Sequence, residues 1–282
     1  MSGTLYLVAT PIGNLEDITL RALRILKEVD LIACEDTRHS RKLLNHYGIT
    51  TALTAYHQHN EEPKAEKLVE KLQNGKSIAL ISDAGTPGIS DPGYRIVVAC
   101  RNAGLTVVAV PGPSAVISAL AISGLPTDAF VFAGFLPAKS TPRREALARL
   151  RAESRTTLFY EAPHRLGETL AEIVAELGGE RMVAVARELT KMHEELVRGT
   201  AAEVQQHFAA KEIKGEIVLL IAPASAAETP TITVKEALAQ LLAEGTLLRA
   251  AVKQVAKAYG LPGDEVYKEA LAMKGEGGEA SA

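Results

Sequence analysis

The chain has few cysteines and little net charge, and these two scarcities exclude several classes of protein. Only two of its 282 residues are cysteine, Cys34 and Cys100, and no motif spacing pairs them. Because Cys34 lies in an apolar run, we expect reduced, buried thiols and neither a disulfide framework nor a zinc or other metal site. The formal net charge is −3, so a polyanionic partner would have to bind a local basic patch instead of the whole surface.

The chain also lacks an uninterrupted apolar run of membrane-spanning length. Its most apolar stretch, residues 104–125, is broken by Pro111, Gly112 and Pro113, which would leave backbone groups without partners in lipid. No basic region precedes the apolar residues 5–9, so this segment is read as a first strand and not as a signal peptide. We therefore expect a cytoplasmic protein without a membrane partner.

Residues 1–122 alternate short β-type runs with amphipathic helical runs. The periodicity predicts strands at 5–9, 31–34, 52–56, 78–81 and 106–110, and helices at 16–28, 38–47, 63–74, 91–102 and 114–123. Strands joined by crossover helices are parallel, and their connecting loops gather at the carboxyl ends. The sequence thus predicts an N-terminal α/β domain with a mostly parallel sheet.

From residue 123 the pattern changes, because strands at 130–135, 157–160, 183–187, 195–198 and 217–221 have fewer helices between them. The short polar link between 187 and 195 predicts a hairpin, and therefore a mixed sheet in a second α/β domain, 123–223. Residues 224–230 have the composition of a linker, and residues 275–282 are predicted to be disordered.

Residues 231–274 predict a small helical C-terminal domain, with helices at 234–243, 247–259 and 264–273. Residues 260–263 form the turn between the last two helices. Two interpretations stay open. The unit is either a three-helix bundle with solvated lysines or a helix-turn-helix that reads nucleic acid, with Lys253, Lys257 and Lys268 on one side.

Two loops, residues 81–93 and 110–115, follow buried strands and are richer in glycine and proline than a simple chain reversal requires. Lying at the same end of one sheet, they define a ligand crevice. The segment Gly112, Pro113 and Ser114 opens a helix, where free N–H groups and the helix dipole favour a carboxylate. Ser82, Asp83 and Ala84 are expected on the opposite wall, with Asp83 either a ligand or a helix cap.

The residues resemble the ribosomal RNA small subunit methyltransferase I family of the tetrapyrrole methylase superfamily. The resemblance rests on seven segments in order: 8–19 (VATPIGNLEDIT), 35–38 (EDTR), 82–93 (SDAGTPGISDPG), 111–115 (PGPSA), 159–165 (FYEAPHR), 187–191 (RELTK) and 215–216 (GE). Corrinoid and sirohaem methyltransferases typically have a glycine-rich first loop and a Gly-Gly-Asp-Pro stretch in the later loop. Here these segments read TPIGN (10–14) and SDAGTP (82–87), which favours the RNA branch.

The resemblance implies an S-adenosylmethionine-dependent methyltransferase that modifies the ribose 2′-hydroxyl of a cytidine in the decoding region of 16S rRNA. It also implies a substrate within the small ribosomal subunit, a cofactor cleft between two α/β domains, and a homodimer. Carrying the motifs over adds further cofactor-binding residues to those of the two loops, namely Pro11, Ala115, Tyr160, Glu161, Ala162, Gly215 and Glu216.

Methyl transfer to a weakly acidic hydroxyl requires alignment and gains from a base or a cation. The candidates near strand ends are Glu35, Asp36, His164 and Lys191, and positioning without a base is the alternative. Arg38, Arg95 and Arg165 are candidate phosphate contacts or members of surface ion pairs.

The strongest basic patch lies at 139–155, where Pro142 marks a helix start and Arg144, Arg151 and Arg155 could share one face. It is read either as an RNA contact or as a solvated helix face, and its basic residues are Lys139, Arg143, Arg144, Arg149, Arg151 and Arg155. Two other functions stay open for the whole chain: a methyltransferase for a tetrapyrrole or another small molecule, and a non-catalytic RNA-binding protein of ribosome assembly.

Overall fold

The computed structural model describes residues 2–58, 60–209, 212–224, 233–259 and 261–276. The chain divides into two compact units, Met1–Pro223 and Ala224–Ala282. The first unit contains two five-stranded sheets, and the second contains helices only among its described residues. The predicted α/β class, with one parallel and one mixed sheet, is confirmed.

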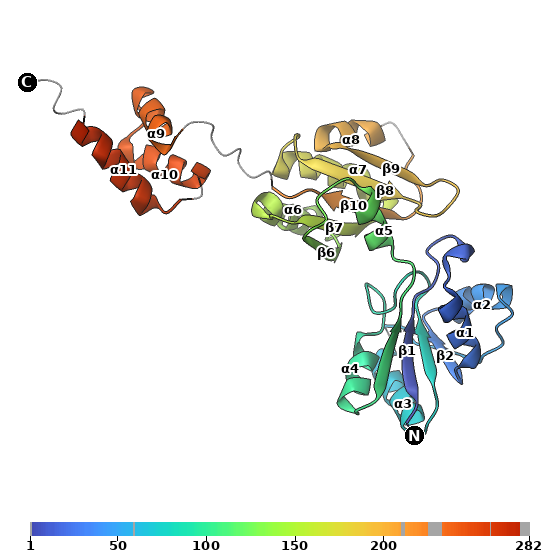
Figure 1. The fold of residues 1–282 in the computed structure, drawn as a ribbon. Coiled ribbons are helices and arrows are strands. Elements are labelled where there is room, and N and C mark those ends of the chain that lie inside the picture. Colours follow the sequence, from blue (N-terminus) through green and yellow to red (C-terminus); the bar gives the residue numbers. More distant parts are fainter. Residues whose placement is uncertain (1, 59, 210–211, 225–232, 260, 277–282) are drawn as a thin grey trace, which may run out of the picture. The chain divides into compact units, whose positions relative to one another are not determined.

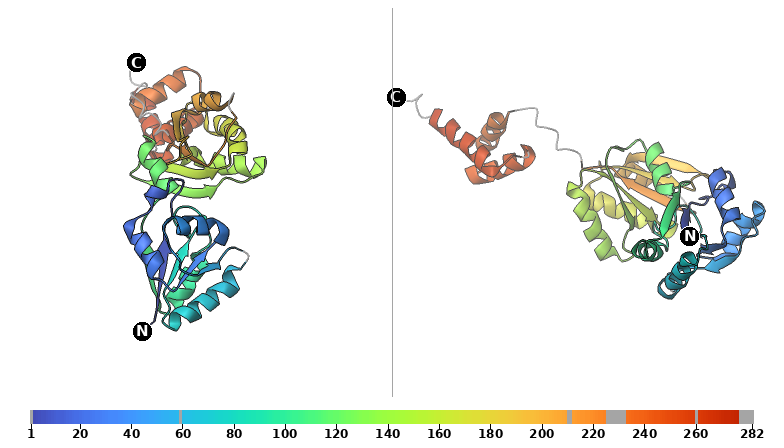
Figure 2. Two further views of the ribbon diagram at one scale, coloured as in Figure 1. Left: turned by 90° about the vertical axis from the view of Figure 1, so that its right-hand side faces the viewer. Right: turned by 60° about the horizontal axis from the view of Figure 1, so that its bottom comes forward.

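The first sheet is parallel throughout and has the strand order β3-β2-β4-β1-β5. Its strands are β1 (Thr4–Val8), β2 (Leu31–Cys34), β3 (Leu53–Ala55), β4 (Ile78–Ile81) and β5 (Thr106–Val110). Helices α1 (Leu20–Glu28) and α2 (Thr37–His46) pack on one face, and α3 (Glu61–Gln73) and α4 (Tyr94–Asn102) pack on the other (Figures 1 and 2). The carboxyl ends of all five strands therefore meet at one edge.

Two predicted helix boundaries in this region are wrong, each for a local reason. The segment 16–28 is split into a 3₁₀ turn, η1 (Leu15–Asp17), and α1, because Thr19 is extended and its hydroxyl accepts the N–H of Ala22 at 3.1 Å. Helix α4 begins at Tyr94 and not at residue 91, because Gly93 has a φ of 154° that no helix accommodates.

The second sheet has the order β6-β7-β10-β8-β9. Strands β6 (Phe130–Phe135) and β7 (Thr156–Glu161) are parallel, whereas β10 (Ile217–Ile221), β8 (Met182–Arg187) and β9 (Glu195–Thr200) complete it with antiparallel pairs. The predicted hairpin is confirmed, with Arg187 opposite Glu195.

The second sheet is covered on both faces. Helices α6 (Ser140–Arg149), α7 (Pro163–Leu177) and α8 (Ala201–Ala209) pack on one face, and α5 (Ala115–Ile122) packs on the other. The sequence predicted few helices in this domain, but the structure has α6, α7 and α8 between its strands. The longest of them, α7, buries Leu166, Leu170 and Ile173 at helical spacing. Helix α6 begins two residues before Pro142, and a 3₁₀ turn, η2 (Leu150–Ala152), ends it.

The second unit consists of α9 (Val234–Ala243), α10 (Leu248–Tyr259) and α11 (Gly263–Glu276), which share a core that includes Leu238, Val255 and Val266. The predicted linker beyond Ala224 and residues 277–282 of the predicted tail lie outside the described residues. No helix in the described ranges combines the length and the apolarity that a membrane crossing requires.

Candidate cofactor and substrate site

A cavity of about 350 Å³ lies within the first unit, against the α5 face of the second sheet. This volume is in the range of small-molecule sites. Its first wall comes from the loops after β1, β4 and β5, and its second wall from the ends of β6, β7 and β8 and the start of β10. The lining residues are Ile12, Ala84, Gly85, Thr86, Ile89, Ser114 and Ala115 from the first wall, and Phe135, Tyr160, Glu161, Ala162, Pro163, Ala186, Leu189, Gly215, Glu216, Ile217 and Val218 from the second.

The first wall is shaped by a short bridge between two loops. Thr10 and Gly85 exchange backbone hydrogen bonds of 2.9 and 3.0 Å, and the Thr10 hydroxyl donates to the carbonyl of Ser82 at 3.1 Å. The Ser82 hydroxyl in turn donates within its own loop, to the carbonyls of Ala84 and Gly85. Ser82 therefore holds the loop in shape from beneath, and Ala84 and Gly85 face the cavity.

Helix α5 directs its N-terminus at the cavity. The hydroxyl of Ser114 caps the helix by accepting from Ile117, and the backbone N–H groups of Ala115 and Val116 have no partner among the described residues. Gly112 lies close to the loop after β1, because a Cβ there would lie 3.0 Å from the Cβ of Ala9. The helix start thus offers two free donors beside the cavity, where the dipole favours negative charge or a hydroxyl oxygen.

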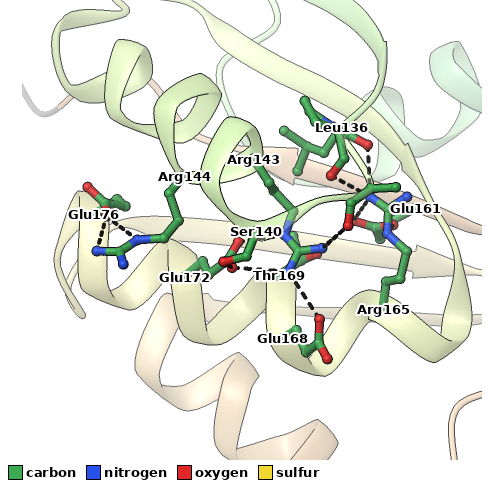
Figure 3. A network of polar contacts seen from close by, with 12 residues as sticks. Leu136, Ser140, Arg143, Arg144, Glu161, Arg165, Glu168, Thr169, Glu172 and Glu176 are labelled. Carbon is green, nitrogen blue, oxygen red and sulfur yellow. Dashed lines mark hydrogen bonds and ion pairs between the residues drawn. The ribbon is translucent and has the colours of Figure 1, made fainter.

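The second wall is anchored by Glu161, whose side chain is 0% exposed (Figure 3). Its carboxylate accepts from the Thr169 hydroxyl at 2.7 Å and from the N–H of Ala162 at 2.8 Å, and it lies 3.2 Å from the Arg165 guanidinium. Arg165 also donates to the carbonyl of Leu136 at 2.8 Å. Glu161 and Arg165 therefore join β7, α7 and the end of β6, and Arg165 is not available as the predicted phosphate contact.

Tyr160 forms an aromatic part of the wall with Phe132 and Phe135, at ring-centroid distances of 4.9 and 5.5 Å. Burial, together with the charges of Asp91 and Glu216, raises the pKa of Tyr160. The phenol is therefore neutral at physiological pH and acts as an apolar surface with a hydroxyl.

Lys191 closes the rim through two ion pairs, at 2.7 Å to Glu188 and 3.1 Å to Glu216. Burial alone would lower the pKa of Lys191, but the hydrogen bonds to these carboxylates raise it. Glu188 and Thr190 have backbone φ values of 52° and 65°. Residues other than glycine rarely adopt such values unless the surrounding structure enforces them. The lysine is thus a fixed cation, and it is a poor candidate for a base.

The other candidate bases differ in their surroundings. Asp36 caps α2 by accepting from the N–H of Arg38 at 2.7 Å, a bond that lowers the pKa of Asp36. Burial and the neighbouring charge of Asp83 raise the pKa of Glu35. His164 is exposed in the first turn of α7, next to the lining residue Pro163. Of the four, Glu35 is the carboxylate whose surroundings favour proton uptake.

Most of the predicted basic patch is neutralised by carboxylates, and Figure 3 shows the contacts of Arg143 and Arg144. Arg144 and Arg151 both pair with Glu176 at 2.7 Å, and Arg155 pairs with Glu153 at 2.8 Å, so the three do not form one free helix face. The side chain of Arg143 is 2% exposed, and its prediction as an RNA contact is wrong.

Three other predicted RNA contacts lie at the surface. Arg95 pairs with Glu61 and Glu62. Lys139 and Arg149 are exposed, and neither forms an ion pair within the described ranges. They remain predicted RNA contacts.

The predicted cofactor residues fall into two groups. Ala84, Ser114, Ala115, Tyr160, Glu161, Ala162, Gly215 and Glu216 line the cavity, whereas Pro11, Ser82, Asp83, Gly112 and Pro113 flank it. The sequence interpretation missed the apolar lining. Ala186, Ile217 and Val218 lie on strands, and a strand residue inside a sheet does not reveal which face has a cavity. Ile12 and Leu189 lie in the loops after β1 and β8, where no periodicity indicates which side chains turn inward.

The fold and the site identify the class of protein to which this chain belongs. Residues 4–205 match the family model of Tetrapyrrole (Corrin/Porphyrin) Methylases. Among solved structures, a cobalt precorrin-4 methyltransferase is 18% identical with a TM-score of 0.59, covering 78% of this chain and 94% of its own. The uroporphyrin-III-C-methyltransferase of Thermus thermophilus is 20% identical with a TM-score of 0.56, covering 79% of this chain and 95% of its own. The protein is a methyltransferase of this fold, and its methyl donor is S-adenosylmethionine.

The particular family follows from closer relatives. A protein of Synechocystis sp. named ribosomal RNA small subunit methyltransferase I is 48% identical over 98% of this chain and 100% of its own length. The protein of that name from Escherichia coli O157:H7 is 50% identical over 97% of this chain and 96% of its own. The chain belongs to the ribosomal RNA small subunit methyltransferase I family.

The cavity fits the cofactor chemically. S-adenosylmethionine is a cationic sulfonium flanked by an amino acid and an adenosine. Apolar Ile12, Leu189 and Val218 suit the adenine, the donors at Ala115 and Val116 suit a carboxylate or a ribose hydroxyl, and Glu216 adds negative charge for a cation.

Proposed function

We propose that this protein transfers the methyl group of S-adenosylmethionine to the ribose 2′-hydroxyl of a cytidine in the decoding region of 16S rRNA. The observation that carries the proposal is the 48–50% identity, over nearly the whole chain, to proteins named ribosomal RNA small subunit methyltransferase I. When bound, the cofactor supplies an electrophilic methyl group. The chain supplies binding, alignment and proton removal.

Within this proposal, Glu35 is the base and Lys191 is an electrostatic and positioning residue. Glu35 directly follows β2 at the sheet edge that carries the cavity loops, and burial and the charge of Asp83 raise its pKa, which favours proton uptake. Lys191 is instead held as an ammonium by Glu188 and Glu216. Replacing Glu35 by Gln is expected to lower kcat by about 10²–10⁴-fold with little change in cofactor affinity. An unchanged kcat would favour catalysis by alignment alone.

The small-subunit context, a homodimer and a cytoplasmic location belong to the same proposal. The exposed Ile117 and Ile122 on α5 provide an apolar surface that a second copy could cover. Light scattering coupled to size exclusion measures the mass of the particle, and a monomer at working concentration would contradict the homodimer.

The decisive experiment is transfer of tritium from labelled S-adenosylmethionine to small ribosomal subunits taken from cells without this enzyme. Nuclease mapping and nucleoside analysis then locate the label, and 2′-O-methylcytidine is expected. The solved neighbours named for precorrin and uroporphyrin methylation favour a small-molecule substrate as the second candidate. Absence of label in subunits, with cofactor binding intact and a tetrapyrrole methylated, would establish that alternative.

A further inference from the structure

Helix α2 presents a cationic face that contains no acidic residue. The ten residues of the helix, Thr37–His46, include neither Asp nor Glu. Ser40, Leu43 and Leu44 are buried, and the two leucines pack in the core beneath the first sheet. The exposed positions are Arg38, His39, Arg41, Lys42, Asn45 and His46.

Within the described residues, these cations have little compensation from carboxylates. Arg38 is 91% exposed and lies 3.6 Å from the half-exposed carboxylate of Asp36, a weak pair in water. Neither Arg41 nor Lys42 forms an ion pair within the described residues. Because Arg38 is three and four residues before the other two, like charges are neighbours on the helix and destabilise it. A face that opposes helix stability requires another explanation.

The position of α2 relates it to the cavity. The helix follows β2 at the carboxyl edge of the first sheet, and the N–H of its capping residue Asp36 donates to Asp83 at 3.3 Å. Asp83 precedes Ala84, which lines the cavity. Helix α1 packs on the same face of the sheet and adds the exposed Arg21 and Lys27 (Figure 1).

Two other helices of the first unit that carry cations provide a contrast. In α6, the exposed Arg144 pairs with Glu176. In α3, on the opposite face of the first sheet, the exposed Lys67 and Lys71 alternate with Glu66 and Glu70. With a net charge of −3 for the whole chain, the uncompensated cations of α2 stand out as a local patch.

We propose that the exposed face of α2 binds the phosphate backbone of the RNA substrate beside the target nucleotide and holds that strand at the cofactor cavity. This inference rests on the proposed function. Arg41 and Lys42 contact phosphates, so they contribute affinity and orientation without reading the base sequence. Arg38, at the crevice end of the helix, contacts the phosphate nearest to the reacting ribose.

The test compares two double variants that remove equal charge. R41Q/K42Q changes the α2 face, and K67Q/K71Q changes α3 as the matched control. The affinity of each protein for small ribosomal subunits lacking the modification is measured between 50 and 200 mM salt. Loss of two phosphate contacts is expected to reduce the slope of log K against log salt by about 1.5 and to weaken binding at least tenfold at the lowest salt.

Calorimetry with S-adenosylmethionine and thermal melting verify that each variant is folded. For R41Q/K42Q, a raised KM for subunits with unchanged cofactor affinity supports the proposal. An unaltered salt slope for R41Q/K42Q, or an equal loss of affinity in K67Q/K71Q, overturns the proposal for α2. In that case the proposed function still stands if the wild-type protein methylates subunits. If the wild-type protein neither binds nor methylates subunits, the proposed function fails and the surface proposal fails with it.

Discussion

Arg143 is expected to be a structural arginine whose removal destabilises the fold without a direct effect on RNA binding. Its guanidinium donates to Glu172 at 2.5 and 3.0 Å, to Glu168 at 3.1 Å and to the carbonyl of Ala138 at 3.3 Å. Replacing Arg143 by Met keeps the apolar stem and removes every one of these bonds. The carboxylate of Glu172, with a side chain 14% exposed, is then left without its cation.

The magnitude follows from the burial of the pair. Removing one partner of a buried ion pair costs about 3–5 kcal/mol, because the remaining charge is uncompensated. The pair with Glu168 adds little, since that side chain is 75% exposed. For a unit of this size, the loss corresponds to a fall of about 6–20 °C in melting temperature.

Thermal melting followed by circular dichroism tests the prediction for R143M, with R143M/E172M as the control. Exchanging the whole buried pair for apolar side chains is nearly neutral, so the double variant is expected to recover most of the loss. The hydrogen bond from Arg143 lowers the pKa of Glu172, so the contribution is present above the ordinary carboxyl range and is lost as the pH falls through the lowered value. An R143M variant with unchanged melting and a specific loss of RNA affinity would refute the reasoning.

Three further predictions concern the rim and the first wall. Gly215→Ala is expected to weaken cofactor binding about tenfold, because φ is 91° and a Cβ would lie 2.4 Å from the side chain of Glu188. Lys191→Met is expected to lower cofactor affinity several-fold and stability by about 1–3 kcal/mol, because Glu188 and Glu216 lose their common cation. Burial raises the pKa of Asp91 to about 6, so the stability that this group contributes falls as the pH rises from about 4 to about 6. Across that window, the melting temperature of Asp91→Asn should rise by about 5 °C relative to the wild type.

Each of these predictions has its own comparison. Calorimetry of Gly215→Ala should show the loss, whereas Gly245→Ala, a glycine with φ of 85° and no atom within 4 Å of a built Cβ, should leave cofactor affinity unchanged. Lys191→Arg should retain more affinity than Lys191→Met, and equal loss would contradict a role for the charge. A melting difference between Asp91→Asn and the wild type that stays constant from pH 4 to pH 7 would contradict the raised pKa.

Local sequence signals predicted the elements that position the site. The alternation of strands and helices predicted the parallel sheet, because period and turn chemistry are local properties. The pattern of Pro113 and Ser114 before an apolar run predicted the helix start at the cavity for the same reason. The motif resemblance identified the family, since ordered segments spread along the chain are more specific than any one of them.

Side-chain partners could not be predicted in this way. Glu161 is a predicted cofactor-binding residue and lines the cavity, but the sequence did not reveal that Thr169 and Arg165 of the following helix hold its carboxylate. The segment 139–155 reads as a basic patch, yet Arg143 and Arg144 meet Glu172 and Glu176 of α7, about thirty positions further along the chain.

The sequence by itself determined the order of elements, the parallel first sheet, the ligand loops and the family, because periodicity, turn residues and motifs lie within short segments. Only the tertiary structure decided which cations have a carboxylate partner, which residues line the cavity, and which carboxylates pair with Lys191 at its rim. These properties depend on contacts between segments distant in sequence. Arginines that look alike in the sequence differ in the structure: Arg144 on α6 pairs with Glu176, whereas Arg41 on α2 forms no ion pair with any described residue.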